Sequence, residues 1–399
     1  MILSWSSVRP EVNTQAILQL HEDIYNLSDA ASHASWKDIP KWWTGPWIYP
    51  HVGYYRPLTS MLYFFEYRLF QDNFRDYNIV TWVLHGVNAG LLFLLTVSLA
   101  NGSRRRKILT GFLSVIFFAS PGSTLFFSTA RALSWWPAQN DVMSLTFAIL
   151  SLCLLDRYLQ DGGKVRLSLA MIAFCASVFS KEMGYITTPL AMGLIFYRRR
   201  LEWKPMAIWA GLTVLLWNMR NWLVPVPWNP GYSSMTIVKK AAMNWGGELW
   251  LLGASGTWWP IIGSVGVVII LIASKYYRWR IWVTAILSIL TFALSAQYLQ
   301  PQGTWAMIFL SNVQLQVFYV LITFAGAALF WKYRKSEPGL LSLYMMEMVY
   351  VPILQYGGPH YFYWPSAFLA LMNACFLVVV IRWMRERYFD RIWVFNNQS

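Results

Sequence analysis

Apolar residues dominate this chain from about residue 78 onward, in runs separated by short polar segments. A run of about 17–25 apolar residues is long enough to cross a bilayer as a helix. The pattern therefore predicts an all-α, polytopic membrane protein with eleven spans. The predicted spans are 78–99, 108–127, 141–158, 166–181, 184–198, 205–221, 257–274, 281–297, 313–331, 339–355 and 365–382.

The first 77 residues follow a different pattern, polar and rich in Trp and Tyr. We expect an extracytoplasmic head (1–77), a transmembrane domain (78–391) and a short cytoplasmic tail (392–399). Segment 235–253 is only half apolar and is expected to lie along the outer surface. Because no apolar span or signal peptide precedes the exported head, we expect the complete protein to have a twelfth, N-terminal span. A tail exported by the span that follows it is the alternative.

Composition and charge support a membrane protein. The chain is 57% hydrophobic and 13% charged, whereas a soluble domain has about 25% charged residues. The net charge of +14 comes mainly from short loops next to apolar runs, at 104–107, 157–166, 198–204, 275–280, 332–335 and 382–391. Such loops are cytoplasmic by the positive-inside rule. The charge therefore indicates topology, and no nucleic-acid partner is predicted.

Two groups of polar residues on the predicted outer side could carry chemistry. Glu22-Asp23 is an acidic pair in the head, and Tyr55-Arg56 opens a Tyr-Arg-Pro-Leu stretch. A carboxylate near the membrane surface could act as a general base, and an arginine could stabilise an anionic leaving group. An acidic pair in a polar loop is also typical of a solvated surface.

Further charged residues stand at the outer ends of spans. Lys181 and Glu182 separate two spans, and a lysine at that depth could hold a phosphate as a point charge. Neutralisation by Glu182 or another carboxylate is the alternative. Arg131 and Asp141 flank Trp135-Trp136-Pro137. Asp141 would equally suit the first turn of a helix, where the helix dipole favours an acidic residue.

The last candidates are aromatic or lie inside spans. His360 and Tyr361 belong to an aromatic strip that could bind a sugar ring or a prenyl chain, or form an interfacial belt. His85 and Asn88 are expected to bond helices together. The cysteines at 153, 175 and 375 fit small core residues rather than disulfides or a zinc site. No cofactor is predicted, although Glu22, Asp23 and Asp141 could bind a divalent metal ion if they converge.

The order of these motifs resembles that of the GT-C class of polytopic membrane glycosyltransferases. It is most similar to the transmembrane O-mannosyltransferases with tetratricopeptide repeats and to their repeat-free bacterial relatives. The likeness covers roughly residues 20–200 and 345–372. The motifs that carry it are Glu22-Asp23, Trp36 to Asp38, the Tyr-Arg-Pro-Leu at 55–58, Tyr77 with His85, Ser180-Lys181-Glu182 with Pro189, and His-Tyr-x-Tyr-x-Pro-Ser at 360–366.

The resemblance implies transfer of a hexose, with mannose as one candidate, from a polyprenyl-phosphate-linked donor to an acceptor hydroxyl on the extracytoplasmic side, with inversion. By position, Asp23 would be the catalytic base and Glu22 its neighbour. The implied substrate-binding residues are Tyr55, Arg56, Arg131, Asp141, Lys181, Glu182, His360 and Tyr361. The acceptor could be protein, lipid or glycan, and the membrane a bacterial inner membrane or that of the endoplasmic reticulum.

The chain also departs from the family pattern, and other functions stay open. Its acidic pair is Glu-Asp where the family commonly has Asp-Asp, His360 stands where arginine is usual, and no repeat region follows the last span within these 399 residues. The alternatives are a lipid-linked glycan polymerase or ligase, a transporter or flippase of lipid-linked substrates, and a membrane scaffold. Transporters commonly contain paired repeats, which this sequence lacks.

Overall fold

The computed structural model describes residues 14–50, 53–71, 73–119, 132–198, 203–224 and 363–384, with a few positions between 338 and 349. Throughout these residues the regular structure is helical and no strand occurs. The all-α prediction is therefore confirmed for the described part of the chain. The predicted spans 257–274, 281–297 and 313–331, most of 339–355 and the segment 235–253 lie outside it.

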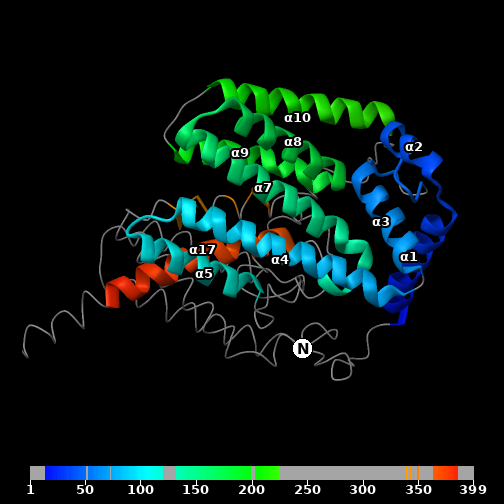
Figure 1. Cartoon of the computed structure of the whole chain (residues 1–399), viewed down its shortest axis with the longest axis horizontal. Coiled ribbons are helices and arrows are strands. Elements are labelled where there is room, and N and C mark those ends of the chain that lie inside the picture. The colour runs from blue at the N-terminus through cyan, green and yellow to red at the C-terminus, as the bar shows by residue number, and fades with distance from the viewer. Residues whose placement is uncertain are drawn as a thin grey trace, which may run out of the picture.

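Long helices stand at the other predicted spans (Figure 1). They are α4 (Phe74–Leu99), α5 (Arg104–Ala119), α7 (Gln139–Asp161), α8 (Lys164–Ser180), α9 (Thr187–Tyr197), α10 (Trp203–Leu223) and α17 (Tyr363–Met384). Within the described residues, Asp76–Leu99 and Trp136–Asp161 are the two helical stretches long and apolar enough to cross a membrane.

These helices pack in a continuous series. α17 lies against α5, α5 against α4, α4 against α7, and α7 against α8 and α9, while α10 covers α9. α4 and α7 run parallel: Asn88, midway along α4, donates to the Val142 carbonyl near the start of α7, and Gln160 near the end of α7 donates to Ser98 near the end of α4. The core between them is aliphatic and aromatic, as expected for helices that are apolar on most sides.

Two glycines turn the chain between α7 and α8. α7 ends at Gly162, with φ of 77°, and Gly163 precedes α8 with φ of 102°. L side chains rarely adopt this left-handed region, so glycine is favoured at both positions. The short connection makes α7 and α8 antiparallel neighbours, so the end of α8 returns to the start of α7.

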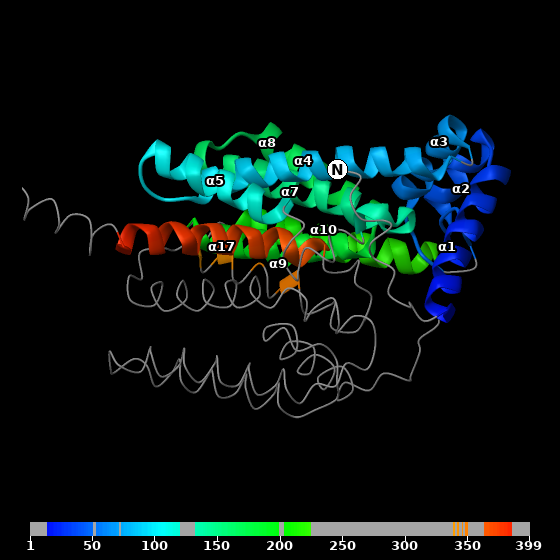
Figure 2. The ribbon, with the colours of Figure 1, turned by 90° about the horizontal axis from the view of Figure 1, so that it is seen from below.

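The head forms a separate group of short helices at one end of the long helices (Figures 1 and 2). It comprises α1 (Thr14–His33), the 3-10 turn η1 (Trp36–Asp38), α2 (Ile39–Thr44) and α3 (Pro57–Phe70). Its core is aromatic: Trp42, Trp47, Tyr63 and Phe64 pack together with Trp136 of the turn η2 (Trp136–Ala138). This shared core fixes the head onto the start of α7.

At the opposite end, polar contacts join α4, α7 and α9. Asp156 is buried and accepts hydrogen bonds from Arg198 Nε at 2.7 Å and from the Ser98 hydroxyl at 2.5 Å. Tyr197 donates to the Leu99 carbonyl. The basic segments 104–107 and 157–166 and the residue Arg198 therefore lie at the end of the bundle away from the head.

Candidate functional site

The structure places some of the predicted site residues and leaves others outside the described part. Glu22 and Asp23 lie on α1, and their side chains are not among those described. Arg131, His360 and Tyr361 lie outside the described residues. The catalytic assignment of Asp23 and the binding roles of these three residues therefore stay predictions.

The remaining predicted residues meet where α3, the start of α7 and the end of α8 come together. Arg56, which immediately precedes α3, binds Glu182 through Nε at 2.8 Å and Nη2 at 2.6 Å. The Arg56 side chain is 7% exposed and that of Glu182 29% exposed. The guanidinium also lies over the ring of Tyr54, 3.8 Å from its centroid, which adds a cation–π contact.

A second ion pair lies deeper. Lys181 Nζ donates to Asp141 Oδ2 at 2.5 Å, with side-chain exposures of 6% and 0%. Lys181 therefore pairs with Asp141 rather than with its sequence neighbour Glu182. Asp141 lies in the first turn of α7, where the helix dipole favours a carboxylate. In this structure Lys181 is therefore neutralised by a carboxylate other than Glu182, which was the alternative to phosphate binding.

We call Arg56, Asp141, Lys181 and Glu182 the charged quartet. Its two positive and two negative charges balance, as buried charges must because unpaired ones are costly to desolvate. Burial favours a higher pKa for Glu182, but the adjacent Arg56 guanidinium outweighs it and holds that pKa below its ordinary value. Oδ1 of Asp141 and Oε1 of Glu182 are buried without a hydrogen-bond partner. Each of these two oxygens could therefore accept a further hydrogen bond.

Local backbone structure sets Lys181 and Glu182 in place. α8 ends at Ser180, and Lys181 is extended, with φ of −161°, before the 3-10 turn η3 (Glu182–Ile186) begins. Gly184 lies so close to α8 that an added Cβ would stand 2.4 Å from the backbone of Ser177 and Val178. Only glycine permits this approach without a shift.

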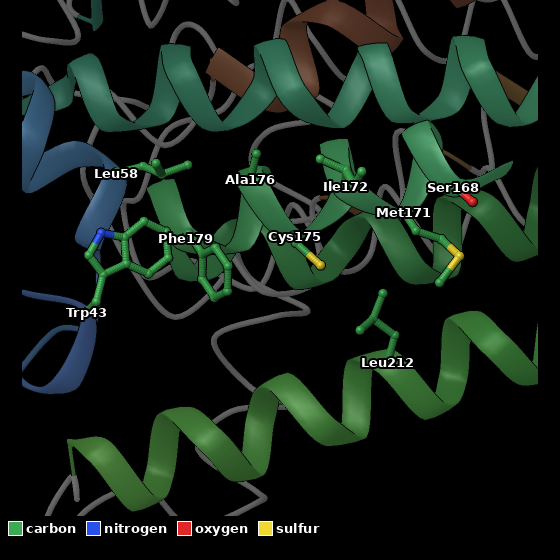
Figure 3. A pocket seen from close by; sticks show the side chains of 9 residues that line it. All are labelled: Trp43, Leu58, Ser168, Met171, Ile172, Cys175, Ala176, Phe179 and Leu212. Atoms are coloured by element: carbon green, nitrogen blue, oxygen red, sulfur yellow. The ribbon is translucent and has the colours of Figure 1, made fainter. Parts of the chain in front are cut away.

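An apolar groove runs along α8. It has a volume of about 490 Å³ and is lined by Met171, Ile172, Cys175 and Phe179 of α8 and Leu212 of α10. Trp43 and Leu58 of the head close one end of it (Figure 3). Figure 3 shows Met171 and Cys175 of α8 on the side toward Leu212. Ser168 is the one polar residue among those that line it.

The head end of the groove is lined by residues close in sequence to the charged quartet. The Phe179 ring lies 5.2 Å from that of Trp43 and 6.1 Å from that of Tyr55. Tyr55 also donates to the Trp43 carbonyl at 3.0 Å. Because Tyr55 precedes Arg56 and Phe179 lies two residues before Lys181, an apolar chain in the groove would end beside buried charges.

Glu66 was not among the candidate site residues that the sequence indicated. This carboxylate on α3 is 2% exposed and accepts hydrogen bonds from Trp136 Nε1 at 2.9 Å and Gln139 Nε2 at 2.6 Å. Burial raises its pKa to about 7, against the effect of these two donors. A single charged residue within the aromatic run Phe64-Phe65-Glu66-Tyr67 was the available signal, since charged residues are rarely buried without a partner.

Polar residues inside α4 have the role expected for them. His85 Nδ1 lies 2.8 Å from the Tyr363 hydroxyl, and Asn88 Nδ2 donates to the same hydroxyl at 3.0 Å. These contacts bind α17 to α4, which confirms the prediction of interhelical hydrogen bonds. The cysteines at 153, 175 and 375 are free thiols.

No cluster of three His, Cys, Asp or Glu side chains arranged to hold a metal ion occurs among the described residues. Convergence of Glu22 and Asp23 with Asp141 involves side chains outside this part of the chain. Comparison of the chain with protein-family models, with curated proteins and with solved structures found no match.

Proposed function

We propose that this chain is a GT-C-type membrane glycosyltransferase. It transfers a hexose from a polyprenyl-phosphate-linked donor to an acceptor hydroxyl at the extracytoplasmic face. The observation that carries this proposal is the apolar groove on α8, whose lining residue Phe179 contacts Tyr55, the sequence neighbour of Arg56. A ligand that fits both the groove and the charged quartet has a long apolar tail and a charged head group, as a polyprenyl phosphate has.

The groove and the quartet bind different parts of the donor. The prenyl chain lies along α8, where aliphatic and aromatic side chains favour its burial. The phosphate binds at Arg56, whose planar guanidinium suits bidentate binding of an oxyanion. Because Arg56 already holds Glu182, the phosphate displaces that carboxylate or shares the guanidinium with it.

The two ion pairs differ in how readily they exchange. Glu182 is partly exposed, so its carboxylate can move into water when phosphate arrives. Asp141 is fully buried, and separating it from Lys181 would leave an unpaired charge in the core. The Arg56–Glu182 pair therefore opens for the donor, while the Lys181–Asp141 pair stays closed and holds the end of α8 against the start of α7.

The remaining parts of the reaction belong to the head. Asp23, on α1, acts as the general base toward the acceptor hydroxyl, with Glu22 beside it. The leaving polyprenyl phosphate is stabilised mainly by Arg56, and Lys181 and Arg131 are the further residues assigned to it. The chain crosses the membrane with eleven spans, and the head lies on the extracytoplasmic side.

Cys175 provides a direct test, because it lines the groove. In the full chain with Cys153→Ser and Cys375→Ser, the rate at which a small thiol reagent modifies Cys175 is measured in nanodiscs. Polyprenyl-phosphate hexose should slow the modification, whereas inorganic phosphate alone should not. A matched variant keeps only Cys153, on α7 outside the groove, and should show no protection. Equal rates at Cys175 with and without the donor would contradict the proposal.

A further inference from the structure

One face of α3 carries a row of polar contacts that the proposed function does not use. Thr59, Tyr63 and Glu66 are spaced by four and three positions, so they lie on the same side of the helix. All three are buried, with exposures of 0%, 0% and 2%. Each bonds to an element outside the head, so this face of α3 joins the head to the long helices.

The start of α3 holds the end of α8. The Thr59 hydroxyl donates to the Ser180 carbonyl at 2.6 Å, and Arg56 binds Glu182. These contacts fix the residues on both sides of Lys181. The N-terminal half of α3 therefore determines where the Lys181 ammonium can reach.

The other half of α3 holds the start of α7. The Tyr63 hydroxyl donates to the Pro137 carbonyl at 3.1 Å, and both carboxylate oxygens of Glu66 accept hydrogen bonds, one from Trp136 and one from Gln139. Trp136 is held further by the Tyr63 ring, 5.1 Å away. Asp141 follows two residues after Gln139, so its position depends on these contacts.

Helix α3 thus bridges the two sides of the Lys181–Asp141 ion pair. We propose that Glu66 is a positioning residue: it fixes the Trp136–Gln139 segment on α3 and so keeps Asp141 within hydrogen-bond distance of Lys181. A contribution of Glu66 to sugar transfer rests on the proposed function. Its effect on the Lys181–Asp141 pair does not.

A carboxylate suits this position because it accepts two hydrogen bonds and donates none. Glutamine would keep one acceptor oxygen but would direct an NH2 group at the second donor. Alanine would remove both of the oxygen atoms that accept these hydrogen bonds from Trp136 and Gln139. The effect of substitution should therefore increase from Gln to Ala.

The test measures how fast Lys181 reacts with an amine-acylating reagent, relative to the exposed Lys41, in the full chain in nanodiscs. Mass spectrometry reports both rates. Asp141→Asn should raise the rate at Lys181, and Glu66→Gln and Glu66→Ala should raise it by about three- to tenfold, within the range of coupling between contacting residues. The matched control is Asp161→Asn, which replaces an exposed carboxylate at the opposite end of the bundle. It should leave the rate at Lys181 unchanged.

A double-mutant cycle separates positioning from general loosening. If Glu66 acts through Asp141, then Glu66→Gln has little further effect once Asp141→Asn is present. An equal effect in both backgrounds, or an unchanged Lys181 rate in a folded Glu66→Ala protein, would overturn the proposal. Tyr63→Phe, which removes the bond to Pro137, should act in the same direction and serves if Glu66→Ala does not fold. The test uses no sugar donor, so its result can be interpreted even if the proposed function is wrong.

Discussion

The charges at the head end of the bundle are paired between distant segments rather than between neighbours. Lys181 and Glu182 are adjacent in sequence, yet each bonds to a residue at least 40 positions away. Removing one member of a buried pair leaves its partner desolvated and unpaired, at a cost of about 3–5 kcal/mol. Such pairs bind the head, α7 and α8 into one unit.

Arg56→Ala should destabilise the protein strongly because Glu182 loses its partner. We expect a loss of about 2–5 kcal/mol in unfolding free energy, with the lower value set by the partial exposure of Glu182. Arg166→Ala removes an exposed pair with Asp161 and should cost less than about 1 kcal/mol. Chemical denaturation of both variants would measure the difference. Equal losses would show that the Arg56 pair contributes no more than a surface contact.

Glu66 should make stability depend on pH. Its pKa is about 7 in the folded protein and near 4.5 when exposed, so the folded state holds an extra proton between these values. Stability therefore falls as pH rises from about 4.5 to 7, by on the order of 3 kcal/mol from this group. Glu66→Gln should reduce that slope in thermal unfolding followed by tryptophan fluorescence. The same slope in both proteins would contradict the assignment.

Sequence alone located several site residues but not their partners. Tyr55, Arg56, Lys181 and Glu182 were singled out from motifs, and the pairing of Lys181 with Asp141 was left open. The pairing could not be predicted because it depends on the α7–α8 turn, which brings residues 40 positions apart together. Glu66 belongs to no motif and was missed, since its partners Trp136 and Gln139 lie on another element.

The elements themselves followed from the sequence more closely than the site did. The spans predicted at 78–99, 141–158 and 166–181 differ from α4, α7 and α8 by only a few residues at each end. Continuous apolar runs and the glycines at 162 and 163 specify these helices locally. The turn η3 was not predicted, because it depends on the close packing of Gly184 against α8.

Gly184→Ala should therefore displace η3, which begins with Glu182, and with it Lys181, which precedes η3. An added methyl group would meet the backbone of Ser177 and Val178, which cannot move as a side chain can. We expect a loss of about 1–3 kcal/mol or more in stability, as for overpacked cores. Gly86→Ala is the control: it lies in α4 with nothing within 4 Å of the added Cβ. Its stability should be unchanged or higher, as helix propensity implies. An undisturbed Gly184→Ala protein would contradict this account of η3.

Over the described residues, large apolar side chains are exposed on the long helices, and polar contacts are concentrated at the two ends of the bundle. The outward faces of α4, α5 and α10 expose large hydrophobic residues, among them Trp82, Phe112 and Leu215. The head lies at one end of the helices, and the basic segments 104–107 and 157–166 and the residue Arg198 lie at the other. The positive-inside rule would place the two ends on opposite sides of the bilayer.

Single cysteines would test this topology. The two test variants are Lys37→Cys and Ser103→Cys. Lys37 lies in the head, Ser103 lies in the loop before α5, and both positions are exposed. Each is introduced into a chain whose three native cysteines are replaced by Ser. A membrane-impermeant thiol reagent added from the extracytoplasmic side should label position 37 and leave position 103 unlabelled until the membrane is permeabilised. Labelling of both positions, or of neither, before permeabilisation would contradict the proposed orientation.

The most direct test of the central claim is turnover of a lipid-linked sugar. The full chain in nanodiscs is incubated with radiolabelled polyprenyl-phosphate hexoses and a mixture of protein, lipid and glycan acceptors, and loss of label from the lipid is followed. We predict turnover by the unmodified chain and by Asp29→Asn, an exposed carboxylate on the same helix as Asp23. Asp23→Asn should reduce the rate by at least about 100-fold, as expected for loss of a general base. No turnover with any donor, or full turnover by a folded Asp23→Asn protein, would contradict the account.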